Sequence, residues 1–414
     1  MNGYPKFYKI KLSFPDFVVE DIEKSIKQAV SDMALSERIR SGDEIAITAG
    51  SRGITNIPEI LKLIGNEVKT FGAKPFLVAA MGSHGGGQGP GMLNVLGSLG
   101  ITEDRVKMKI KATDKVVYLK ETESGFPVYC AEEAYQADGI IIVNRVKTHT
   151  AFHGPHESGL FKMLSVGLGR AKGAVSVHSL GPDKMAQSVY EVGKAILNRA
   201  PVVGGIAIVE NGNEETAIIK GCKPDEFEYV DSSLLEEARK LTPSLPVKRA
   251  DLLIIQEMGK NYSGTGIDTN VIGRFALDDF PDPKIPDITR IVVLNLSDAS
   301  HGNANGVGLA DFITKRLFDA IDLPATYLNG LTTNFLKRIK IPVIMPDDQQ
   351  AIEKAWVSLR LEKPEKARVL IIHNTLNLNE LYISEALLDE VVKLDNAVIL
   401  SEYQLMFNNG TIVL

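Results

Sequence analysis

The chain has 414 residues, which is long for one hydrophobic core and favours two domains. Its net charge of −6 gives no electrostatic basis for binding nucleic acid or an anionic membrane surface. No stretch reaches the roughly 20 apolar residues that a membrane helix needs, and the N-terminus lacks the apolar run of a signal peptide. We therefore expect a cytoplasmic protein.

Apolar runs alternate with amphipathic helical stretches along the whole chain, which predicts an α/β fold. In the first half, four apolar runs predict strands: 43–49, 75–80, 139–143 and 205–209. Between the first two, apolar residues recur at helical spacing after Pro58, a residue suited to the start of a helix. This strand-helix-strand unit is typical of a parallel sheet.

The segment 242–249 carries two prolines and little pattern, so we place the domain boundary there. Residues 1–248 then form an N-terminal α/β domain and residues 249–414 a C-terminal one. In the second half, four further runs predict strands: 251–255, 290–294, 341–345 and 368–372. Helical patterns lie around 309–321, 349–359 and 383–393. We expect mostly parallel sheets in both domains and an active-site cleft between them.

A charged or imidazole side chain follows each of three predicted strands: Arg52, His84 and His149. In open α/β sheets, ligands bind outside the carboxyl ends of the strands. If these strands are parallel, the three side chains gather at one edge of the sheet. Arg52 has the planar guanidinium that suits a carboxylate or phosphate, although a surface ion pair is an equal alternative.

Histidines are concentrated in one part of this histidine-poor chain. Four of the seven lie within residues 149–178: His149, His153, His156 and His178. Histidine titrates near neutral pH, and its neutral ring is a common metal ligand. The cluster therefore indicates proton transfer, metal binding or both, whereas any one of these rings taken alone is more ordinary as a core or surface residue.

Two further features point to a ligand site. The run Gly82-Ser83-His84-Gly85-Gly86-Gly87 offers backbone amides to an anion or is a plain flexible turn, and it has neither P-loop nor dinucleotide-binding spacing. Lys162 lies in an apolar, glycine-punctuated stretch, 158–169. There it is either solvated on a helix face or an amine available for covalent attachment or for pairing with an anion.

Together these residues resemble the family of the nickel-pincer-nucleotide-dependent lactate racemase and its homologues, the 2-hydroxyacid racemases and epimerases. The matching pieces are Ser51-Arg52, Gly82-Ser83-His84, the stretch from His149 to Lys162, and His178. The resemblance covers most of the chain. It implies that the first domain holds the cofactor and that the C-terminal domain closes over the site.

The resemblance also implies a role for each matching residue. Lys162 is similar to the lysine that attaches the pyridinium nucleotide, with Ser83 and Gly85 beside the cofactor. His178 is similar to the protein ligand of nickel.

For the reacting acid, His84 and His149 are similar to the paired acid/base histidines, and Arg52 to the arginine that holds the substrate carboxylate. The chain also departs from the family pattern. Ala49 stands where the racemase has an aspartate, and the longer spacing before Lys162 makes His153 a competitor of His149. These departures concern the substrate more than the cofactor.

The expected function is thus an isomerase that racemises or epimerises a 2-hydroxy acid by hydride transfer. Its cofactor would be the nickel-pincer nucleotide, pyridinium-3,5-bisthiocarboxylic acid mononucleotide nickel, and its partners the enzymes that build this cofactor. Two alternatives remain: a divalent-metal hydrolase or lyase built on His149, His153 and His156, and a cofactor-binding homologue without turnover. The polar loops 259–274 and 297–306 either close over the substrate or simply connect elements.

Overall fold

The computed structural model describes residues 4–178, 181–278 and 280–414, and it divides the chain into two compact units. The central unit comprises Pro15–Thr242, and the terminal unit comprises residues 1–14 together with Pro243–Leu414. The division expected from the sequence gave the first residues to the N-terminal domain and placed the boundary at residues 248 and 249. Strand β1 (Phe7–Leu12) instead pairs with two strands near the C-terminus, a long-range pairing that leaves no local sequence signal.

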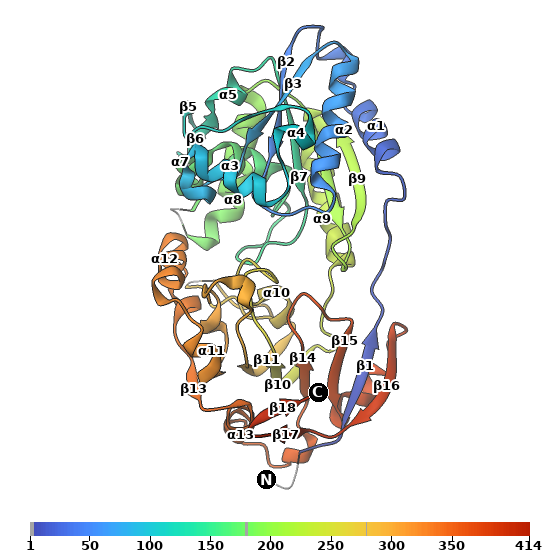
Figure 1. The fold of residues 1–414 in the computed structure, drawn as a ribbon, viewed down its shortest axis with the longest axis vertical. Coiled ribbons are helices and arrows are strands. Elements are labelled where there is room, and N and C mark those ends of the chain that lie inside the picture. The colour runs from blue at the N-terminus through green and yellow to red at the C-terminus, as the bar shows by residue number, and fades with distance from the viewer. Residues whose placement is uncertain (1–3, 179–180, 279) are drawn as a thin grey trace. The chain divides into compact units, whose positions relative to one another are not determined.

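A six-stranded sheet forms the middle of the central unit (Figure 1). In sheet order its strands are β4 (Lys109–Lys111), β3 (Lys74–Ala79), β2 (Glu44–Ala49), β7 (Gly139–Arg145), β8 (Val202–Glu210) and β9 (Thr216–Cys222). Every neighbouring pair is parallel except β8 and β9. A separate hairpin is made by β5 (Val116–Glu121) and β6 (Pro127–Ala131). The predicted α/β class with mostly parallel strands is confirmed.

Helices cover both faces of this sheet. They are α1 (Ile22–Asp32), α2 (Ile57–Thr70), α3 (Gly89–Ser98), α4 (Glu103–Val106), α5 (Glu132–Tyr135), α6 (Leu160–Lys162), α7 (Arg170–His178), α8 (Pro182–Arg199) and α9 (Phe227–Leu241). Apolar residues of α1, α2 and α3 share one buried cluster with Ile47 and Val143, which point to the same face of the sheet. On the opposite face, Phe227 of α9 lies against Gly205.

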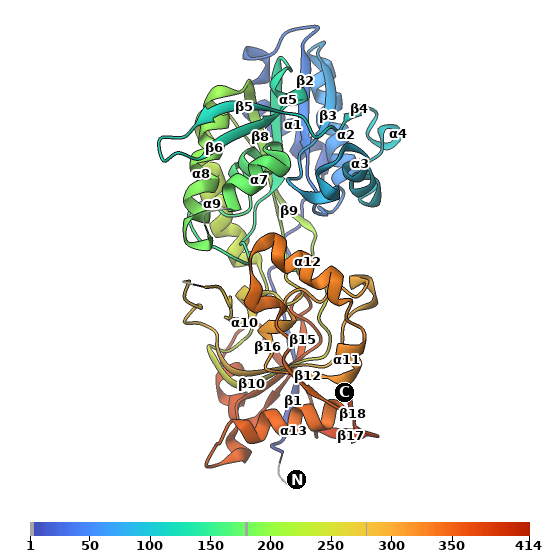
Figure 2. The ribbon, with the colours of Figure 1, turned by 90° about the vertical axis from the view of Figure 1, so that its left-hand side faces the viewer.

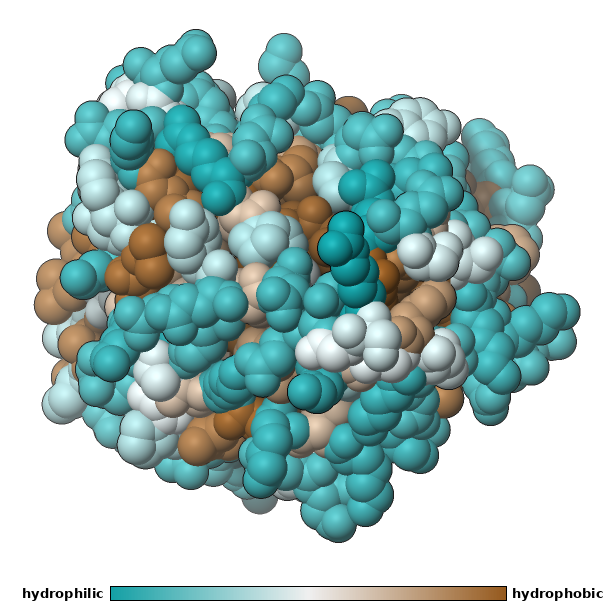
Figure 3. Space-filling model, turned by 90° about the horizontal axis from the view of Figure 1, so that it is seen from above, coloured by the Kyte–Doolittle hydropathy of each residue, from teal (hydrophilic) through white to brown (hydrophobic). Residues whose placement is uncertain are grey.

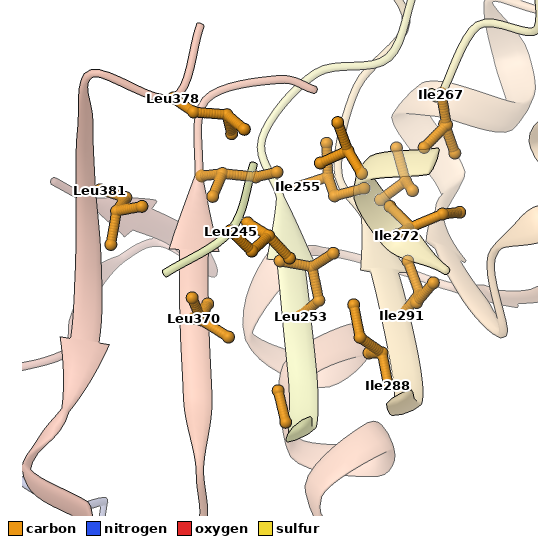
Figure 4. Close-up of a cluster of buried hydrophobic side chains, with 14 of the residues drawn as sticks. Leu245, Leu253, Ile255, Ile267, Ile272, Ile288, Ile291, Leu370, Leu378 and Leu381 are labelled. Atoms are coloured by element: carbon orange, nitrogen blue, oxygen red, sulfur yellow. The ribbon is translucent and has the colours of Figure 1, made fainter. Parts of the chain in front are cut away.

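An eight-stranded sheet forms the terminal unit. In sheet order its strands are β13 (Val343–Met345), β12 (Phe312–Thr314), β11 (Asp287–Val293), β10 (Arg249–Ile255), β14 (Val369–Ile372), β15 (Glu380–Ser384), β1 and β16 (Ala397–Tyr403). The first five run parallel, and the last three add antiparallel pairs. Leu253, Ile291 and Leu370, from three adjacent strands, pack on one face of the sheet (Figure 4).

Short elements complete the terminal unit: α10 (Thr269–Ile272), α11 (Lys315–Asp319), α12 (Leu323–Thr333), α13 (Asp348–Ser358), α14 (Leu388–Val391), β17 (Met406–Asn408) and β18 (Thr411–Val413), seen again in Figure 2. The helical pattern expected over 309–321 was wrong at its start, because 312–314 pair as a strand with β11. The helical pattern expected over 383–393 was also wrong at its start, because residues 383 and 384 are the last two of strand β15. Pairing with a neighbouring strand decides such short apolar runs.

Within the described residues, no helix is long and apolar enough to cross a membrane. The face of the molecule drawn in Figure 3 is mostly hydrophilic, with hydrophobic residues in small scattered groups. Scattered apolar side chains of this kind are normal on protein surfaces and indicate no binding site by themselves.

Candidate active site

The carboxyl ends of three neighbouring strands define the site. Strands β3, β2 and β7 lie side by side and run parallel, so the chain leaves all three at the same edge of the sheet. Arg52 follows β2, His84 follows β3 and His149 follows β7. The sheet therefore gathers these segments at one edge, as the sequence predicted.

The loop after β3 needs its glycines. Four glycines of this loop have positive φ angles that residues other than glycine rarely adopt. The angles are 62°, 65°, 67° and 69° for Gly82, Gly85, Gly86 and Gly87. A Cβ atom on Gly85 would lie 2.4 Å from the carbonyl carbon of Gly91. These constraints fix where the exposed Ser83 and His84 stand.

His84 has a defined protonation pattern in its neutral form. Its Nδ1 lies 2.9 Å from the carbonyl oxygen of Met81, which can only accept a hydrogen bond. The ring proton therefore lies on Nδ1, and Nε2 carries the lone pair. The neutral His84 ring presents a base.

Lys162 ends α6, and the chain continues from Met163 to Leu168 as a π-helix. Turns of a π-helix are rare in proteins, and those that occur often lie at functional sites. This turn packs against the strand ends, since a Cβ atom on Gly167 would lie 3.0 Å from the carbonyl oxygen of Ala80. The Gly82 N–H also donates to the Gly167 carbonyl at 3.4 Å, which joins the loop of His84 to the segment that carries Lys162.

Lys162 meets His149 directly. The distance from Nζ to the Nε2 atom of His149 is 3.1 Å, and the Lys162 amine also lies 5.1 Å from the centre of the Phe152 ring. Burial, together with the positive charge of Arg52, lowers the pKa of Lys162 to about 8. No carboxylate among the described residues pairs with this amine.

A second set of contacts fixes the His149 ring. The Ala151 N–H donates to Nδ1 at 3.1 Å, and the ring lies against Phe152 with 4.2 Å between the two ring centres. Because Nδ1 accepts a hydrogen bond, the proton of the neutral ring lies on Nε2. The neutral His149 ring therefore presents an acid, the reverse of His84.

Glu157 holds the loop of His149 and was missed by the sequence analysis. Only 1% of this residue is exposed. Its carboxylate accepts the His149 N–H at 2.6 Å and the Gly154 N–H at 3.3 Å, and it bonds His153 at 3.1 Å and Arg239 at 2.7 Å. A lone glutamate in a loop gives no sequence signal of such a role.

The structure separates His156 from the other histidines. His156 is buried, its Nδ1 lies 3.0 Å from the Asp231 carboxylate, and its ring stacks on Tyr190 with 5.1 Å between ring centres. His153, in contrast, pairs with Glu157. In the described part of the chain, no three His, Cys, Asp or Glu side chains are grouped so as to hold a metal ion. The proposed metal cluster of His149, His153 and His156 was therefore wrong.

His178, at the end of α7, is the unexplained histidine. Its Nδ1 atom is buried and has no hydrogen-bond partner among the described residues. Burial and the charge of Lys162 lower its pKa to about 4, so the ring is neutral at physiological pH. A neutral imidazole with an unused ring nitrogen suits a metal supplied from outside the chain.

Arg52 is a further basic residue near Lys162. Arg52 is exposed and has no hydrogen bond or salt bridge within the described residues. Desolvation by the surrounding protein and the nearby charge of Arg145 lower its pKa. Arg145 itself is neutralised by the buried Glu210. Arg52 is thus a cation without an ion-pair partner among the described residues. Together with the Lys162 amine and the unused imidazole of His178, it makes a donor set that fits an anionic cofactor bringing its own metal.

The two polar loops of the terminal unit, 259–274 and 297–306, are hydrogen-bonded to each other. The Lys260 N–H donates to Ser300 at 2.8 Å, and the Ser297 hydroxyl donates to Asn261 at 2.6 Å. Both loops follow adjacent parallel strands, β10 and β11. Arg274 is structural, since it donates to the Leu309 carbonyl at 2.8 Å. The expected closing role of these loops stays a prediction.

Comparison with known proteins shows what this chain is similar to. Residues 12–178 match the family model of the lactate racemase N-terminal domain. The lactate racemase apoprotein from Thermoanaerobacterium thermosaccharolyticum is similar in fold, with a TM-score of 0.57 over 89% of this chain and 98% of that one, at 11% identity. A protein from Thermotoga maritima has a TM-score of 0.50 over 77% and 82% of the chains, at 12% identity. No curated protein matches the sequence.

Proposed function

We propose that this chain, whose residues 12–178 match the lactate racemase N-terminal domain, racemises or epimerises a 2-hydroxycarboxylic acid with a lysine-tethered nickel-pincer nucleotide. The observation that carries this proposal is the opposite protonation of His84 and His149. One neutral ring presents a lone pair at Nε2, and the other presents an N–H at Nε2.

The chemistry explains why two such rings are useful. Pulling the α-proton from a 2-hydroxy acid is hard, because the neighbouring carboxylate opposes a second negative charge. When bound, the nickel-pincer nucleotide would supply reversible hydride transfer at that carbon, which avoids the second negative charge. One histidine then removes the hydroxyl proton while the other supplies one, and the two exchange roles for the opposite enantiomer.

The remaining residues bind and orient. Arg52 holds the substrate carboxylate with its uncompensated guanidinium. Lys162 tethers the nucleotide, and Ser83 and Gly85 lie in the loop that would flank it. His178 would ligate nickel, and this binding would weaken in acid because the ring must be neutral. His149 is preferred to His153 as the second acid/base residue, since His149 contacts Lys162.

The test is to produce the protein with and without the enzymes that build the cofactor. Intact mass and metal analysis would show an adduct and nickel, and a chiral assay on lactate, malate and sugar acids would show turnover. Lys162→Ala would lose both adduct and turnover. Full activity of Lys162→Ala would overturn the cofactor assignment, and an adduct without turnover on any acid would identify a non-catalytic homologue.

A further inference from the structure

The hydrogen bonds of His149 determine which group donates and which accepts in its contact with Lys162. The Ala151 N–H occupies Nδ1 of His149, so the proton of the neutral ring lies on Nε2 and points along the 3.1 Å contact to Nζ. An N–H donor needs a lone pair opposite it. An ammonium group has none, whereas a free amine does. The contact is therefore satisfied only when Lys162 is unprotonated.

We propose that, in the chain before any cofactor is attached, His149 holds Lys162 as a free amine ready to attack an activated carboxyl group. His149 thus acts on Lys162 as a positioning residue before it takes part in turnover. The identity of the acyl donor, a carboxyl or thiocarboxyl derivative of the nucleotide, rests on the proposed function. The reactivity of the amine does not.

Burial and one neighbouring charge act in the same direction. Burial disfavours the ammonium form of Lys162, and the positive charge of Arg52 opposes a second positive charge on the amine. Protonating Lys162 would place a charge near Arg52. For His149 to accept from the ammonium, its Nε2 proton would have to move to Nδ1, which breaks the bond from the Ala151 N–H. With a pKa of about 8, roughly a tenth of the amine is free at pH 7, about 300-fold more than for an ordinary lysine.

The chemical step balances without an oxidant or reductant. The Lys162 nitrogen bonds to the acyl carbon, the bond from that carbon to its leaving group breaks, and the proton lost by nitrogen goes to the leaving group. The product nitrogen is an amide or thioamide, whose lone pair is delocalised and cannot accept a hydrogen bond. Acylation therefore releases the Nε2–H of His149, which makes this ring available to the substrate only after the cofactor is in place.

The experiment uses unloaded protein and a small probe, the N-hydroxysuccinimide ester of acetic acid. Limited acetylation between pH 6 and 10 is followed by peptide mass spectrometry, with the exposed Lys172 as the internal reference. We expect the reactivity of Lys162 to level off near pH 8. His149→Leu, which lacks the donor, should lower acetylation of Lys162 at pH 7.5 at least fivefold, whereas His149→Gln, which keeps an N–H, should stay within twofold.

His373→Leu in the terminal unit is the matched control, because it makes the same change at an exposed ring, and it should leave the acetylation of Lys162 unchanged. An unchanged rate in His149→Leu, or no acetylation of Lys162 at pH 8 while Lys172 reacts, would overturn the proposal. If His149→Leu does not fold, the ¹³Cε NMR signal of Lys162 in the native sequence decides, with Lys162→Arg for assignment. A titration midpoint near pH 8 supports the proposal and one above 10 contradicts it. Because no cofactor is needed, failure here is distinct from failure of the racemase assay.

Discussion

The carboxylate of Glu157 accepts the backbone N–H of His149 at 2.6 Å, so a fully buried charge fixes the loop that presents a candidate acid/base residue. The same carboxylate bonds Gly154, His153 and Arg239. Buried charges persist in proteins when several donors surround them. The geometry of His149 therefore depends on a residue that would touch neither substrate nor cofactor.

Replacing Glu157 with Gln should destabilise the fold and displace His149. The amide has one acceptor oxygen and turns an NH₂ group toward donors that need an acceptor, which costs about 2 kcal/mol or more of the free energy of unfolding. Urea denaturation measures this cost. Glu23→Gln, which breaks an exposed pair with Lys27, should change stability by less than about 0.5 kcal/mol. Equal effects of the two substitutions would contradict the role of Glu157.

Replacing Lys162 with Met should stabilise the protein in a pH-dependent way. The pKa of Lys162 falls from 10.5 to about 8 on folding, so the stabilisation that a neutral amine allows is present above pH 10.5 and is lost as pH falls through 8. At pH 7, Lys162→Met should therefore be more stable than the native sequence by about 3 kcal/mol. Urea unfolding at pH 7, 8, 9 and 10 checks this, and an advantage that does not shrink above pH 8 would refute the assigned cause.

The glycine loop offers a matched pair of substitutions. A Cβ on Gly85 would meet the backbone of Gly91 at 2.4 Å, whereas none of the surrounding atoms lies within 4 Å of a Cβ on Gly86. Both have positive φ, so both variants carry the cost of a left-handed backbone, roughly 1–2 kcal/mol. We expect Gly85→Ala to displace His84 and lower turnover strongly, and Gly86→Ala to retain most of it. Chiral assay of the loaded variants measures the difference, and similar turnover of both would contradict it.

Removing the imidazole of His156 should affect folding and leave turnover intact. Phe at this position keeps the contact with Tyr190 but leaves Asp231 with one donor fewer. We expect a lower free energy of unfolding and a rate per loaded active site within a few-fold of the native one. A metal-dependent hydrolase built on His156 requires the opposite, loss of activity without loss of stability.

The two proposed acid/base residues should separate attachment from turnover. His84→Ala should keep the adduct on Lys162 and lower turnover by about 100- to 10,000-fold, the usual contribution of a general acid or base. His149→Ala should lower turnover similarly in whatever fraction becomes loaded, so activity must be expressed per adduct measured by intact mass. His153→Ala is the control on the same loop. Greater loss with His153 than with His149 would reverse the assignment of the second acid/base residue.

The amino-acid sequence alone determined the α/β class, the first βαβ unit and the segments that reach the site. These features are local: apolar period, proline and glycine positions, and the side chain that follows each strand, as with Arg52, His84 and His149. The strand order then brought those ends to one edge.

Only the tertiary structure decided what each side chain meets. Strand β1 joins a sheet formed mainly by residues after 248, His156 pairs with Asp231 across 75 positions of sequence, and Glu157 becomes the buried anchor of a loop. Local sequence does not indicate such partners, because burial and hydrogen bonding depend on residues that folding brings together. The same reason explains why Lys162, one of many lysines in sequence, is distinguished in the fold by a single imidazole 3.1 Å away.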